Sequence, residues 1–320
     1  MIDCVARAPG KIILLGEHWV VHGARAIAAA IGLYARAIGS RSHEDGIVVR
    51  SRELGVTEDI SRECKVFCNL REAVNFLAKT SGREPWPANI VIESDIPMGA
   101  GLGSSAAVAV AFSACYAALG GLSLDFSLIS RAAYESEKIV HGRPSGIDNT
   151  VATYGGFMIY HKERGFTPLS DVRTENIRLL VIDTGIPRST GKAVALFSKR
   201  LNVLGAIGYR LLNIADSIVD ETVRALKEGD PAKIGLMMDV AHGLLNAMGV
   251  SHEALEEVVH LARRLGAYGA KLTGAGMGGT AIALVSESNA DIITKELVRK
   301  GYKVYDVEIG VGGVTYEGSS

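Results

Sequence analysis

The sequence predicts an α+β protein with two domains, each built from helices on one face of a mainly antiparallel sheet. The first observation is length, because 320 residues exceed what a single hydrophobic core usually accommodates. The second is pattern: short β-compatible runs alternate with helical stretches at first, and mostly helical patterns follow after residue 175. We therefore expect one domain over residues 1–175, another over residues 176–320, and a binding cleft between them.

The first half is expected to begin with strands. Residues 5–15 contain β-compatible runs that are broken at Pro9 and Gly10, which predicts two short strands. Residues 24–40 are apolar with small and β-branched side chains, and helical spacing of apolar residues extends over residues 64–79. Further strands are expected at residues 46–51 and 90–94.

Helices are expected around a central loop and through most of the second half. Residues 104–119 are rich in Ala, Val and Phe and end at two glycines, which predicts a buried helix with a normal stop signal. A second helix is expected over residues 127–140, before a loop that contains Pro144. The second half should hold one strand, three helical stretches and a β-β-α-β end. These elements are expected at residues 179–183, 190–226, 231–248, 252–265, 270–273, 280–285, 289–300 and 303–308.

Composition and charge exclude several classes of function. The chain carries 34 basic and 35 acidic residues, and their interspersed pattern gives no broad cationic surface for nucleic acid. No apolar run is long enough to span a bilayer, and the first residues lack the pattern of a secretory signal. The cysteines lack zinc-type spacing, so we expect reduced thiols and a cytoplasmic protein. They are Cys4, Cys64, Cys68 and Cys115.

The strongest chemical signal is the segment Pro97–Ala107, which follows a predicted strand and opens a predicted helix. Glycines at alternate positions let the backbone approach phosphate oxygens, and the free N–H groups of the helix start favour negative charge. A plain glycine-rich turn is the alternative, but alternate glycines followed by two serines favour a phosphate site. The residues expected to bind the nucleotide are Pro97, Gly99, Ala100, Gly101, Leu102, Gly103, Ser104 and Ser105.

Other nucleotide motifs are absent from the sequence. No G-x-x-x-x-G-K-[ST] loop occurs, and the nearest approach, at Gly191 and Lys192, lacks both the first glycine and the hydroxyl. Ala106 stands where a dinucleotide fingerprint usually has its third glycine. The catalytic-loop and D-F-G residues of protein kinases are missing as well.

Three segments together resemble the three signature motifs of the GHMP kinases, in order and at normal separations. They are Ala8–His18, Pro97–Ala107 and Lys271–Gly279. The family is named for galactokinase, homoserine kinase, mevalonate kinase and phosphomevalonate kinase. The resemblance implies an N-terminal domain like ribosomal protein S5 domain 2 and a ferredoxin-like C-terminal domain, with ATP held between them and Mg²⁺ as the metal ion.

Within the family, the likeness to mevalonate kinases extends over nearly the whole chain. Residues 16–23 are similar to their G-E-H-x-V-V-H-G, and residues 137–149 resemble their E-x-x-x-H-G-x-P-S-G-x-D-N. Segments 183–190 and 246–252 match as well. One departure is Met277, where glycine is common, which leaves the backbone geometry of that loop open. The resemblance implies phosphorylation of mevalonate on its C5 hydroxyl to give 5-phosphomevalonate, in isoprenoid precursor synthesis.

Catalytic and metal-binding roles follow from the same resemblance. Asp148 would accept the proton of the alcohol, and Lys11 would neighbour Asp148 and keep it ionised, so both are expected to contact the substrate. Without the family match, Asp148 would be interpreted as a turn residue and Lys11 as a solvated charge. Ser105 and Glu137 are similar to the family's Mg²⁺ ligands, with Ser104 as a rival hydroxyl.

The remaining substrate contacts are assigned by resemblance too. Glu17 and His18 would face the acceptor, although a lone histidine is more often a satisfied hydrogen-bonding residue. Thr190 matches a threonine near the acceptor hydroxyl, with a simple helix N-cap as the alternative. Gly276 belongs to the glycines expected to let the second domain close on the site, with a hairpin-type turn as the alternative. No nucleic acid or membrane partner is expected, and a homodimer is left open.

Other activities compete with this interpretation. Within the family these are phosphomevalonate kinase and a kinase acting on the 3-hydroxyl of mevalonate; outside it, a nucleotide-binding regulator without catalysis. The presence of Lys11, Glu137 and Asp148 favours an enzyme over a regulator. A phosphomevalonate kinase would need a further cationic grip on its substrate's phosphate, for which Arg143 and Arg188 are candidates.

Overall fold

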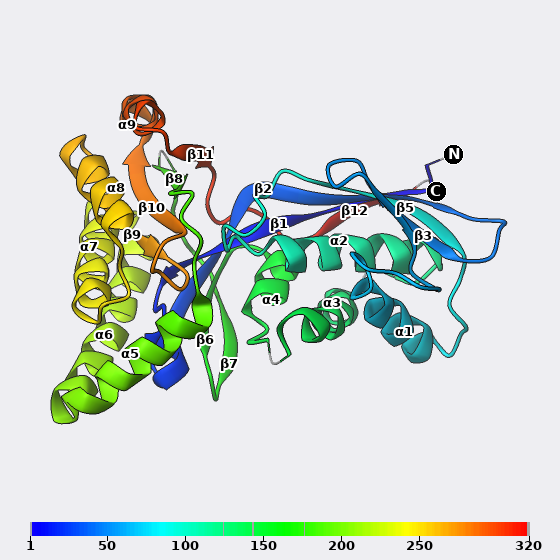
Figure 1. Cartoon of the computed structure of the whole chain (residues 1–320), viewed down its shortest axis with the longest axis horizontal. Helices are drawn as coiled ribbons and strands as arrows, with labels where there is room; N and C mark the ends of the chain where they lie inside the picture. The colour runs from blue at the N-terminus through cyan, green and yellow to red at the C-terminus, as the bar shows by residue number, and fades with distance from the viewer. Residues whose placement is uncertain (1, 124, 143, 176, 319–320) are drawn as a thin grey trace.

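The protein is described by a computed structural model that covers residues 2–123, 125–142, 144–175 and 177–318. Two sheets with their helices lie side by side along the long axis of the molecule (Figure 1). The first part of the chain contributes β1 (Cys4–Leu15), η1 (Trp19–His22), β2 (Ala26–Arg41), β3 (Ile47–Ser51), β4 (Val56–Asp59), α1 (Leu70–Ser81), β5 (Ala88–Ser94), α2 (Ser104–Leu119), α3 (Phe126–His141), α4 (Ile147–Tyr154), β6 (Phe157–His161) and β7 (Gly165–Leu169). The second part contributes β8 (Ile177–Asp183), α5 (Thr190–Leu204), α6 (Ala206–Glu228), α7 (Pro231–Ala247), α8 (Glu253–Arg264), β9 (Gly269–Thr273), β10 (Thr280–Ser286), α9 (Glu287–Arg299), β11 (Lys303–Val307) and β12 (Thr315–Gly318).

The first sheet is mainly antiparallel, as the sequence predicts. Its strands follow the order β12-β1-β2-β5-β3-β4, with β6 paired to β2 and β7 paired to β6. The pair β3 and β5 is parallel. β12 comes from the C-terminal end of the chain and pairs with β1, where Thr315 lies opposite Arg7. The domain boundary near residue 175 stays a prediction.

β1 is one continuous strand, which corrects the expectation of two short strands over residues 5–15. Pro9 and Gly10 lie inside it, and its register with β2 shifts between these two residues. Such a bulge accommodates a proline, which has no N–H to donate to the ladder. β1 therefore continues without a break to Leu15, immediately before Gly16 in the first of the three motif segments.

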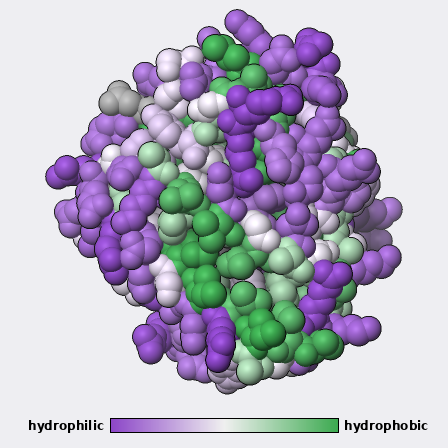
Figure 2. All heavy atoms as spheres, turned by 90° about the vertical axis from the view of Figure 1, so that its left-hand side faces the viewer, coloured by the Kyte–Doolittle hydropathy of each residue, from purple (hydrophilic) through white to green (hydrophobic). Residues whose placement is uncertain are grey.

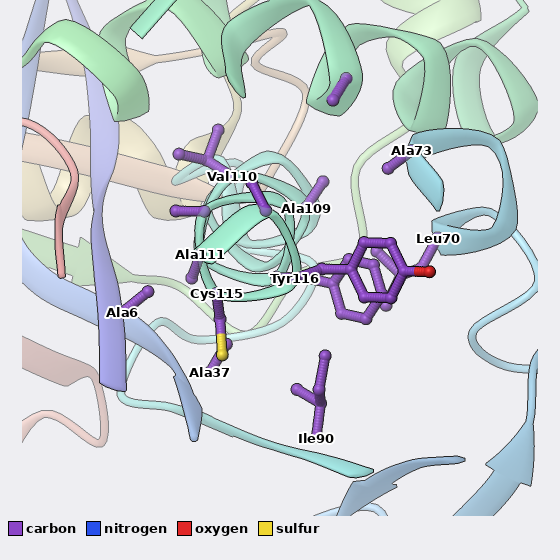
Figure 3. Packing of buried hydrophobic residues seen from close by; sticks show 14 of the residues in the cluster. Ala6, Ala37, Leu70, Ala73, Ile90, Ala109, Val110, Ala111, Cys115 and Tyr116 are labelled. Carbon is purple, nitrogen blue, oxygen red and sulfur yellow. The ribbon is translucent and has the colours of Figure 1, made fainter. Parts of the chain in front are cut away.

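Helix α2 is buried on nearly all sides and confirms the helix expected over residues 104–119. It packs against β1 and β2 on one side and against α1 and α3 on the other. Figure 3 shows α2 end-on, with side chains directed both to the strands and to α1. Gly39 on β2 makes room for this packing, because a Cβ there would lie 2.6 Å from the Cys115 sulfur. The core residues marked in Figure 3 are Ala6, Ala37, Leu70, Ala73, Ile90, Ala109, Val110, Ala111, Cys115 and Tyr116.

The second sheet has the order β11-β8-β10-β9, and its pairs are antiparallel. The order is β8, the four helices α5 to α8, β9, β10, α9 and β11, which is the β-α-β-β-α-β order of a ferredoxin-like fold with four helices in the first connection. The expected β-β-α-β end is confirmed. The helical stretch expected over residues 190–226 is divided into α5 and α6, because Gly205 (φ 51°) interrupts it. Within the described residues, none of the helices is both long and apolar enough to cross a membrane.

The segment before α1 is a loop, although its apolar spacing predicts a helix from residue 64. α1 starts at Leu70. The Glu58 carboxylate accepts hydrogen bonds from the N–H groups of Lys65, Val66 and Phe67, at distances of 2.9–3.0 Å. These contacts to β4 hold residues 65–67 in a turn-rich loop, so the helix begins only at Leu70.

Two of the four cysteines are oxidised, which corrects the expectation of reduced thiols. Cys64 and Cys68 form a disulfide within the loop before α1. Cys4 and Cys115 are free and buried. A spacing of four residues is compatible with a zinc ligand pair, a helix face or a short cross-link, and only the loop conformation brings the two sulfurs together.

The two halves of the molecule share an apolar cluster. Ile12 from β1 and Ile27 from β2 belong to it, together with Leu179 and Val181 from β8. Helices α6 and α7 contribute further side chains, including Ile218. The first sheet is therefore fastened to the second one at the end of β1 where the chemical motifs begin.

Candidate active site

The glycine-rich segment between β5 and α2 forms an open backbone loop. Gly99, Gly101 and Gly103 have φ values of 76°, 81° and 76°, a left-handed conformation that strongly favours glycine. α2 begins at Ser104 with no acidic residue in its first turn. The free N–H groups of that turn are therefore available to bind an anion.

This loop is supported by both halves of the chain. The Leu102 carbonyl accepts a hydrogen bond from the Lys11 N–H at 2.8 Å, and the Ala100 carbonyl accepts one from the Thr280 hydroxyl at 2.8 Å. The side chains of Ala100 and Leu102 are buried in the shared apolar cluster. Ala100 and Leu102, two of the eight residues predicted to bind the nucleotide, thus anchor the loop in the core and do not line the cavity.

A cavity of about 420 Å³ lies against the loop, within the size range of small-molecule sites. Its polar and glycine lining consists of Asn69, Gly99, Gly101, Gly103, Ser104, Ser105, His141, Asp148 and Arg188. Its apolar lining consists of Leu54, Val66, Phe67, Pro97, Met98, Val108 and Val140. The sequence motifs predict most of the polar side, whereas the apolar wall comes largely from loops and helix faces that carry no motif.

Lys11 and Asp148 form an ion pair at the edge of this cavity. The Lys11 Nζ lies 3.0 Å from the Asp148 Oδ1, and the two side chains are 10% and 35% exposed. β1 supplies the lysine, and the first turn of α4 supplies the aspartate. The sequence places Asp148 in a loop, but Gly146 (φ 79°) caps a helix that begins one residue before it. The neighbouring arrangement implied by the resemblance is present.

Ser105 and Glu137 meet between α2 and α3. The Ser105 hydroxyl donates a hydrogen bond to the Glu137 Oε2 at 3.3 Å, and the His141 Nε2 lies 3.5 Å from the same oxygen. The Glu137 side chain is 3% exposed. Burial raises the pKa of Glu137, and the nearby carboxylate of Asp148 raises it further.

The other oxygen of Glu137 fits a bound cation. Oε1 is buried and has no hydrogen-bond partner within the described structure. A buried carboxylate oxygen without a partner is costly unless a positive charge or a donor arrives. No cluster of three or more His, Cys, Asp or Glu side chains arranged for a metal is found among the described residues. This arrangement suits Mg²⁺, which takes one or two protein ligands and completes its shell with phosphates and water.

Glu17 and His18 are tied to the second half of the chain. The buried Glu17 carboxylate pairs through Oε1 with the buried ammonium of Lys271, and its Oε2 has no hydrogen-bond partner among the described residues. His18 lies 2.8 Å from the Ala275 carbonyl through Nε2 and stacks on Phe197 with ring centroids 4.9 Å apart. Burial lowers the pKa of His18. Neither residue lines the cavity described above.

Thr190 and Gly276 lie in different surroundings. Thr190 is exposed and is the first residue of α5, whose N-cap is Ser189, so the N-cap alternative for Thr190 is wrong. Gly276 is buried with φ 74°, and a Cβ there would collide with the Val250 carbonyl. Met277 also takes a left-handed conformation (φ 57°) and donates its N–H to Val250 at 2.7 Å. The third glycine segment therefore keeps its turn despite the methionine.

Two further cations lie at the site: Lys271, which received no role from the sequence, and Arg188, which the sequence offered only as a candidate phosphate grip. Lys271 lies inside the third motif-like segment, which is the signal that could have identified it. Arg188 lies in the segment 183–190 and reaches the wall of the cavity. Arg143, the other candidate for a phosphate grip, lies outside the described residues.

Known proteins resemble this chain in sequence and in fold. The family model described as "GHMP kinases N terminal domain" matches residues 69–156, and the one described as "GHMP kinases C terminal" matches residues 222–303. The mevalonate kinase of Aeropyrum pernix is 38% identical over 320 residues, covering 98% of both chains, and that of Pyrococcus furiosus is 33% identical over 95% of this chain and 98% of its own.

Solved structures give the same result. The L. major mevalonate kinase in complex with R-mevalonate superposes with a TM-score of 0.82 at 32% identity, covering 96% of this chain and 95% of its own. The Methanococcus jannaschii mevalonate kinase reaches a TM-score of 0.84 at 26% identity, over 95% of this chain and 98% of its own. The two-domain α+β architecture expected from the sequence is therefore confirmed.

Proposed function

This chain belongs to the GHMP kinase family, and from that premise we propose that it transfers the terminal phosphoryl group of ATP to the C5 hydroxyl of mevalonate. Its relatives at 33–38% identity over nearly their full length are named mevalonate kinases. The observation that supports the chemistry best is the Lys11–Asp148 pair, 3.0 Å apart, beside a cavity lined by the glycine loop. The family uses ATP as phosphoryl donor.

Asp148 is proposed as the proton acceptor. Phosphoryl transfer needs an alcohol in line with the phosphate, neutralised phosphate charge and a destination for the alcohol proton. The exposed part of the Asp148 carboxylate faces the cavity, while the nearly buried ammonium of Lys11 lies 3.0 Å from its Oδ1. The proton of the acceptor hydroxyl would pass to Asp148 as its oxygen attacks phosphorus.

The glycine loop is proposed to hold the phosphates, and Ser105 with Glu137 to hold Mg²⁺. The loop offers backbone N–H groups at the start of α2, and the metal supplies charge neutralisation when bound. Ser105 is preferred to Ser104 as the metal ligand because its hydroxyl is the one that contacts Glu137. Glu137 Oε1, buried without a partner, is the atom expected to bind the ion.

The apolar wall of the cavity is proposed to receive the adenine ring. Leu54, Val66 and Phe67 approach it from one side, and Val108 and Val140 complete it from α2 and α3. A flat aromatic base gains most by burial against such side chains, and the phosphates then extend towards the glycine loop.

The acceptor is proposed to contact Glu17, His18, Thr190 and Gly276 beside the catalytic pair. Glu17 Oε1 and His18 Nε2 are already engaged by protein partners, so the unpaired Glu17 Oε2 is the atom available to a hydroxyl of the acceptor. A sugar would need more hydrogen-bonding partners than these residues supply, and the neighbouring Trp19 is buried edge-on against Phe197 and adds no polar group.

One assay separates the proposal from its rivals. ADP release is measured with mevalonate, phosphomevalonate, homoserine and galactose as acceptors, and mevalonate should give the highest kcat/KM. Phosphorus NMR of the product should show a phosphate coupled to a CH₂ group, as a 5-phosphate requires. Faster turnover of phosphomevalonate, or a product esterified at the tertiary 3-hydroxyl, would overturn the substrate assignment. Nucleotide binding without turnover of any acceptor would indicate a regulator.

A homodimer is proposed for the assembly. Figure 2 shows a continuous apolar band on the face that lies at the left of Figure 1. The helices on that side are α5, α6 and α7, which carry exposed large apolar side chains, and a contiguous exposed apolar surface often marks an interface. They are Val203, Ile207, Tyr209, Ile214, Leu236 and Val240. Light scattering at micromolar concentration should give twice the monomer mass, and a monomer would contradict the proposal.

A cytoplasmic location is also proposed, from the chemistry of ATP use. The Cys64–Cys68 disulfide is the feature that opposes it, because cytosolic thiols are usually kept reduced. Fractionation of the source cells decides the question, and recovery of the protein outside the ATP-containing compartment would exclude the proposal.

A further inference from the structure

Arg188 occupies the space between the two glycine segments of the site. A Cβ on Gly101, in the loop before α2, would collide with its guanidinium. A Cβ on Gly274 would lie 3.1 Å from its Nη1, and one on Gly279 would lie 3.2 Å from its Cδ. Three glycines from two distant segments thus leave room for this one side chain.

The second half of the chain fixes the loop that carries Arg188. This loop follows β8, and the Thr184 N–H and hydroxyl both donate to the Gly279 carbonyl, at 3.0 Å and 2.6 Å. The Gly279 N–H donates in return to the Ile186 carbonyl at 2.9 Å. Arg188 is therefore positioned by the ferredoxin-like half while its guanidinium lies over the phosphate loop of the other half.

The guanidinium has no protein partner of its own. Within residues 2–123, 125–142, 144–175 and 177–318, no hydrogen bond or ion pair within 4.0 Å involves Arg188. Burial lowers its pKa, and the more distant carboxylates of Asp148 and Asp183 raise it. An arginine stays protonated in proteins, so a half-buried cation with five N–H donors faces the cavity. It is the only Lys or Arg among the described residues that line this cavity.

We propose that Arg188 binds the terminal phosphate of the nucleotide and stabilises the phosphoryl group during its transfer. This inference rests on the proposed kinase function and adds a residue to it. In the reaction, the bond from the γ-phosphorus to the bridging oxygen breaks, a bond to the acceptor oxygen forms, and the acceptor proton passes to Asp148. The three remaining γ-oxygens keep their negative charge throughout, and Arg188 donates hydrogen bonds to them.

The competing ligand for this guanidinium is the carboxylate of the acceptor. The position over Gly101, in the loop that opens α2, favours the phosphate, because the cavity on that side is lined by Ser104 and Ser105. Lys11 cannot take the same role without leaving Asp148, 3.0 Å away. Arg188 is thus the cation that the site has available for the extra charge that distinguishes ATP from ADP.

Calorimetric titration tests this assignment without any acceptor. With Mg²⁺ present, Arg188→Met should weaken binding of the non-hydrolysable analogue AMPPNP ~10-fold or more, while ADP binding changes less than ~3-fold. Its kcat should fall ~10²-fold or more, with a smaller fall for Arg188→Lys, which keeps the charge but loses the fork of donors. If Arg188→Met fails to fold by circular dichroism, the same comparison is made with Arg188→Lys, and equal AMPPNP and ADP losses would reject the assignment.

Arg200→Met is the matched control. Arg200 also packs against a glycine, Gly249, and donates through Nη1 to the Ala247 carbonyl at 3.2 Å, away from the cavity. It should leave both nucleotide affinities unchanged. A rise in the KM for mevalonate with an unchanged AMPPNP to ADP ratio would assign Arg188 to the acceptor and overturn the proposal. The protein could show Arg188-dependent preference for AMPPNP and still fail to phosphorylate mevalonate. That result would refute mevalonate as the acceptor and leave the assignment of Arg188 to the terminal phosphate in place.

Discussion

At the residue scale, the ion pair of Lys11 and Asp148 determines the chemistry that the site can perform. The lysine is nearly buried on β1, whereas the aspartate keeps 35% of its side chain exposed towards the cavity. A carboxylate that is oriented by a neighbouring cation and still accessible is suited to accept a proton from an alcohol. The lysine alone, fixed by its strand, has little freedom to follow a moving phosphate.

Asp148→Asn should therefore remove catalysis and keep the nucleotide. We expect kcat to fall ~10²-fold or more, and AMPPNP affinity to stay within a few-fold of wild type. Steady-state kinetics and calorimetry measure the two quantities. Asp95→Asn is the matched control, since Asp95 forms an exposed pair with Arg36. An Asp148→Asn enzyme with nearly normal kcat would exclude this residue as the base.

Glu137 makes a second prediction, on magnesium and pH. Burial raises the pKa of Glu137, so protonation removes the metal ligand as pH falls through that raised pKa. The Mg²⁺ concentration for half-maximal rate should rise in wild type as pH is lowered towards the raised pKa of Glu137. In Glu137→Gln it should be higher at every pH and depend less on pH, and Ser105→Ala should raise it as well.

The control for this titration lies two residues away on the same helix. Glu135 is half-exposed and pairs with Lys138 at 2.7 Å, so Glu135→Gln should leave the Mg²⁺ dependence as in wild type. Identical Mg²⁺ curves for wild type, Glu137→Gln and Ser105→Ala would contradict the metal assignment. If Ser104→Ala alone shifts the Mg²⁺ curve, Ser104 and not Ser105 supplies the hydroxyl that binds the metal ion.

The residues proposed for catalysis and metal binding could be chosen one by one from the sequence, whereas their mutual contacts were harder to predict. Asp148, Lys11, Ser105 and Glu137 stand in motifs whose residue types suit phosphate and metal chemistry, and resemblance related them to each other. The contact between Glu17 and Lys271 spans 254 residues of sequence, and no local pattern indicates such a pair.

At the element scale, helices whose ends are marked by glycine were predicted well. A helix preceded by residues that continue its apolar spacing was predicted to start too early. α2 ends at glycines and begins at a glycine, so its limits were correct. The apolar spacing of residues 64–69 continues the period of α1, although Glu58 holds these residues as a loop. α4, β6, β7 and β12 are short, and their sequences lack the periodicity that identifies an element without tertiary contacts.

The loop closed by Cys64 and Cys68 leads to a prediction, because Val66 between them lines the cavity. Reduction by dithiothreitol should lower the free energy of unfolding by about 2 kcal/mol, from the chain entropy of so small a loop. AMPPNP affinity should fall a few-fold as Val66 and Phe67 gain freedom. Calorimetry and denaturant unfolding measure both effects. The double variant Cys64→Ser/Cys68→Ser should behave as the reduced protein and should not respond to dithiothreitol; a response would place the reducible bond elsewhere.

At the scale of the whole molecule, the two halves meet through buried contacts that belong to the site itself. The apolar cluster extends from β1 to β8, and Thr280 supports the glycine loop from the second sheet. The Glu17–Lys271 pair lies in the same zone, with side chains 2% and 0% exposed. Domain count and sheet type followed from length and pattern, but the return of β12 to β1 depends on long-range pairing that sequence periodicity does not encode.

The buried pair allows the junction between the halves to be tested. Burial raises the pKa of Glu17 and lowers that of Lys271, and the charge of each partner opposes these shifts. Lys271→Met removes the cation and should lower the free energy of unfolding by about 3–5 kcal/mol at pH 8, because an unpaired carboxylate then stays buried. A carboxyl whose folded pKa is raised is tolerated when protonated, so the loss should shrink as pH falls towards 5 and grow as pH rises through that pKa.

Glu17→Gln/Lys271→Met should recover much of the stability at pH 8, since it removes both charges. Denaturant unfolding of the wild type, the two single variants and the double variant at both pH values gives the coupling energy. Additive single effects, or a loss at Lys271→Met that is the same at pH 5 and pH 8, would show that the Glu17–Lys271 pair does not stabilise the junction between the two halves.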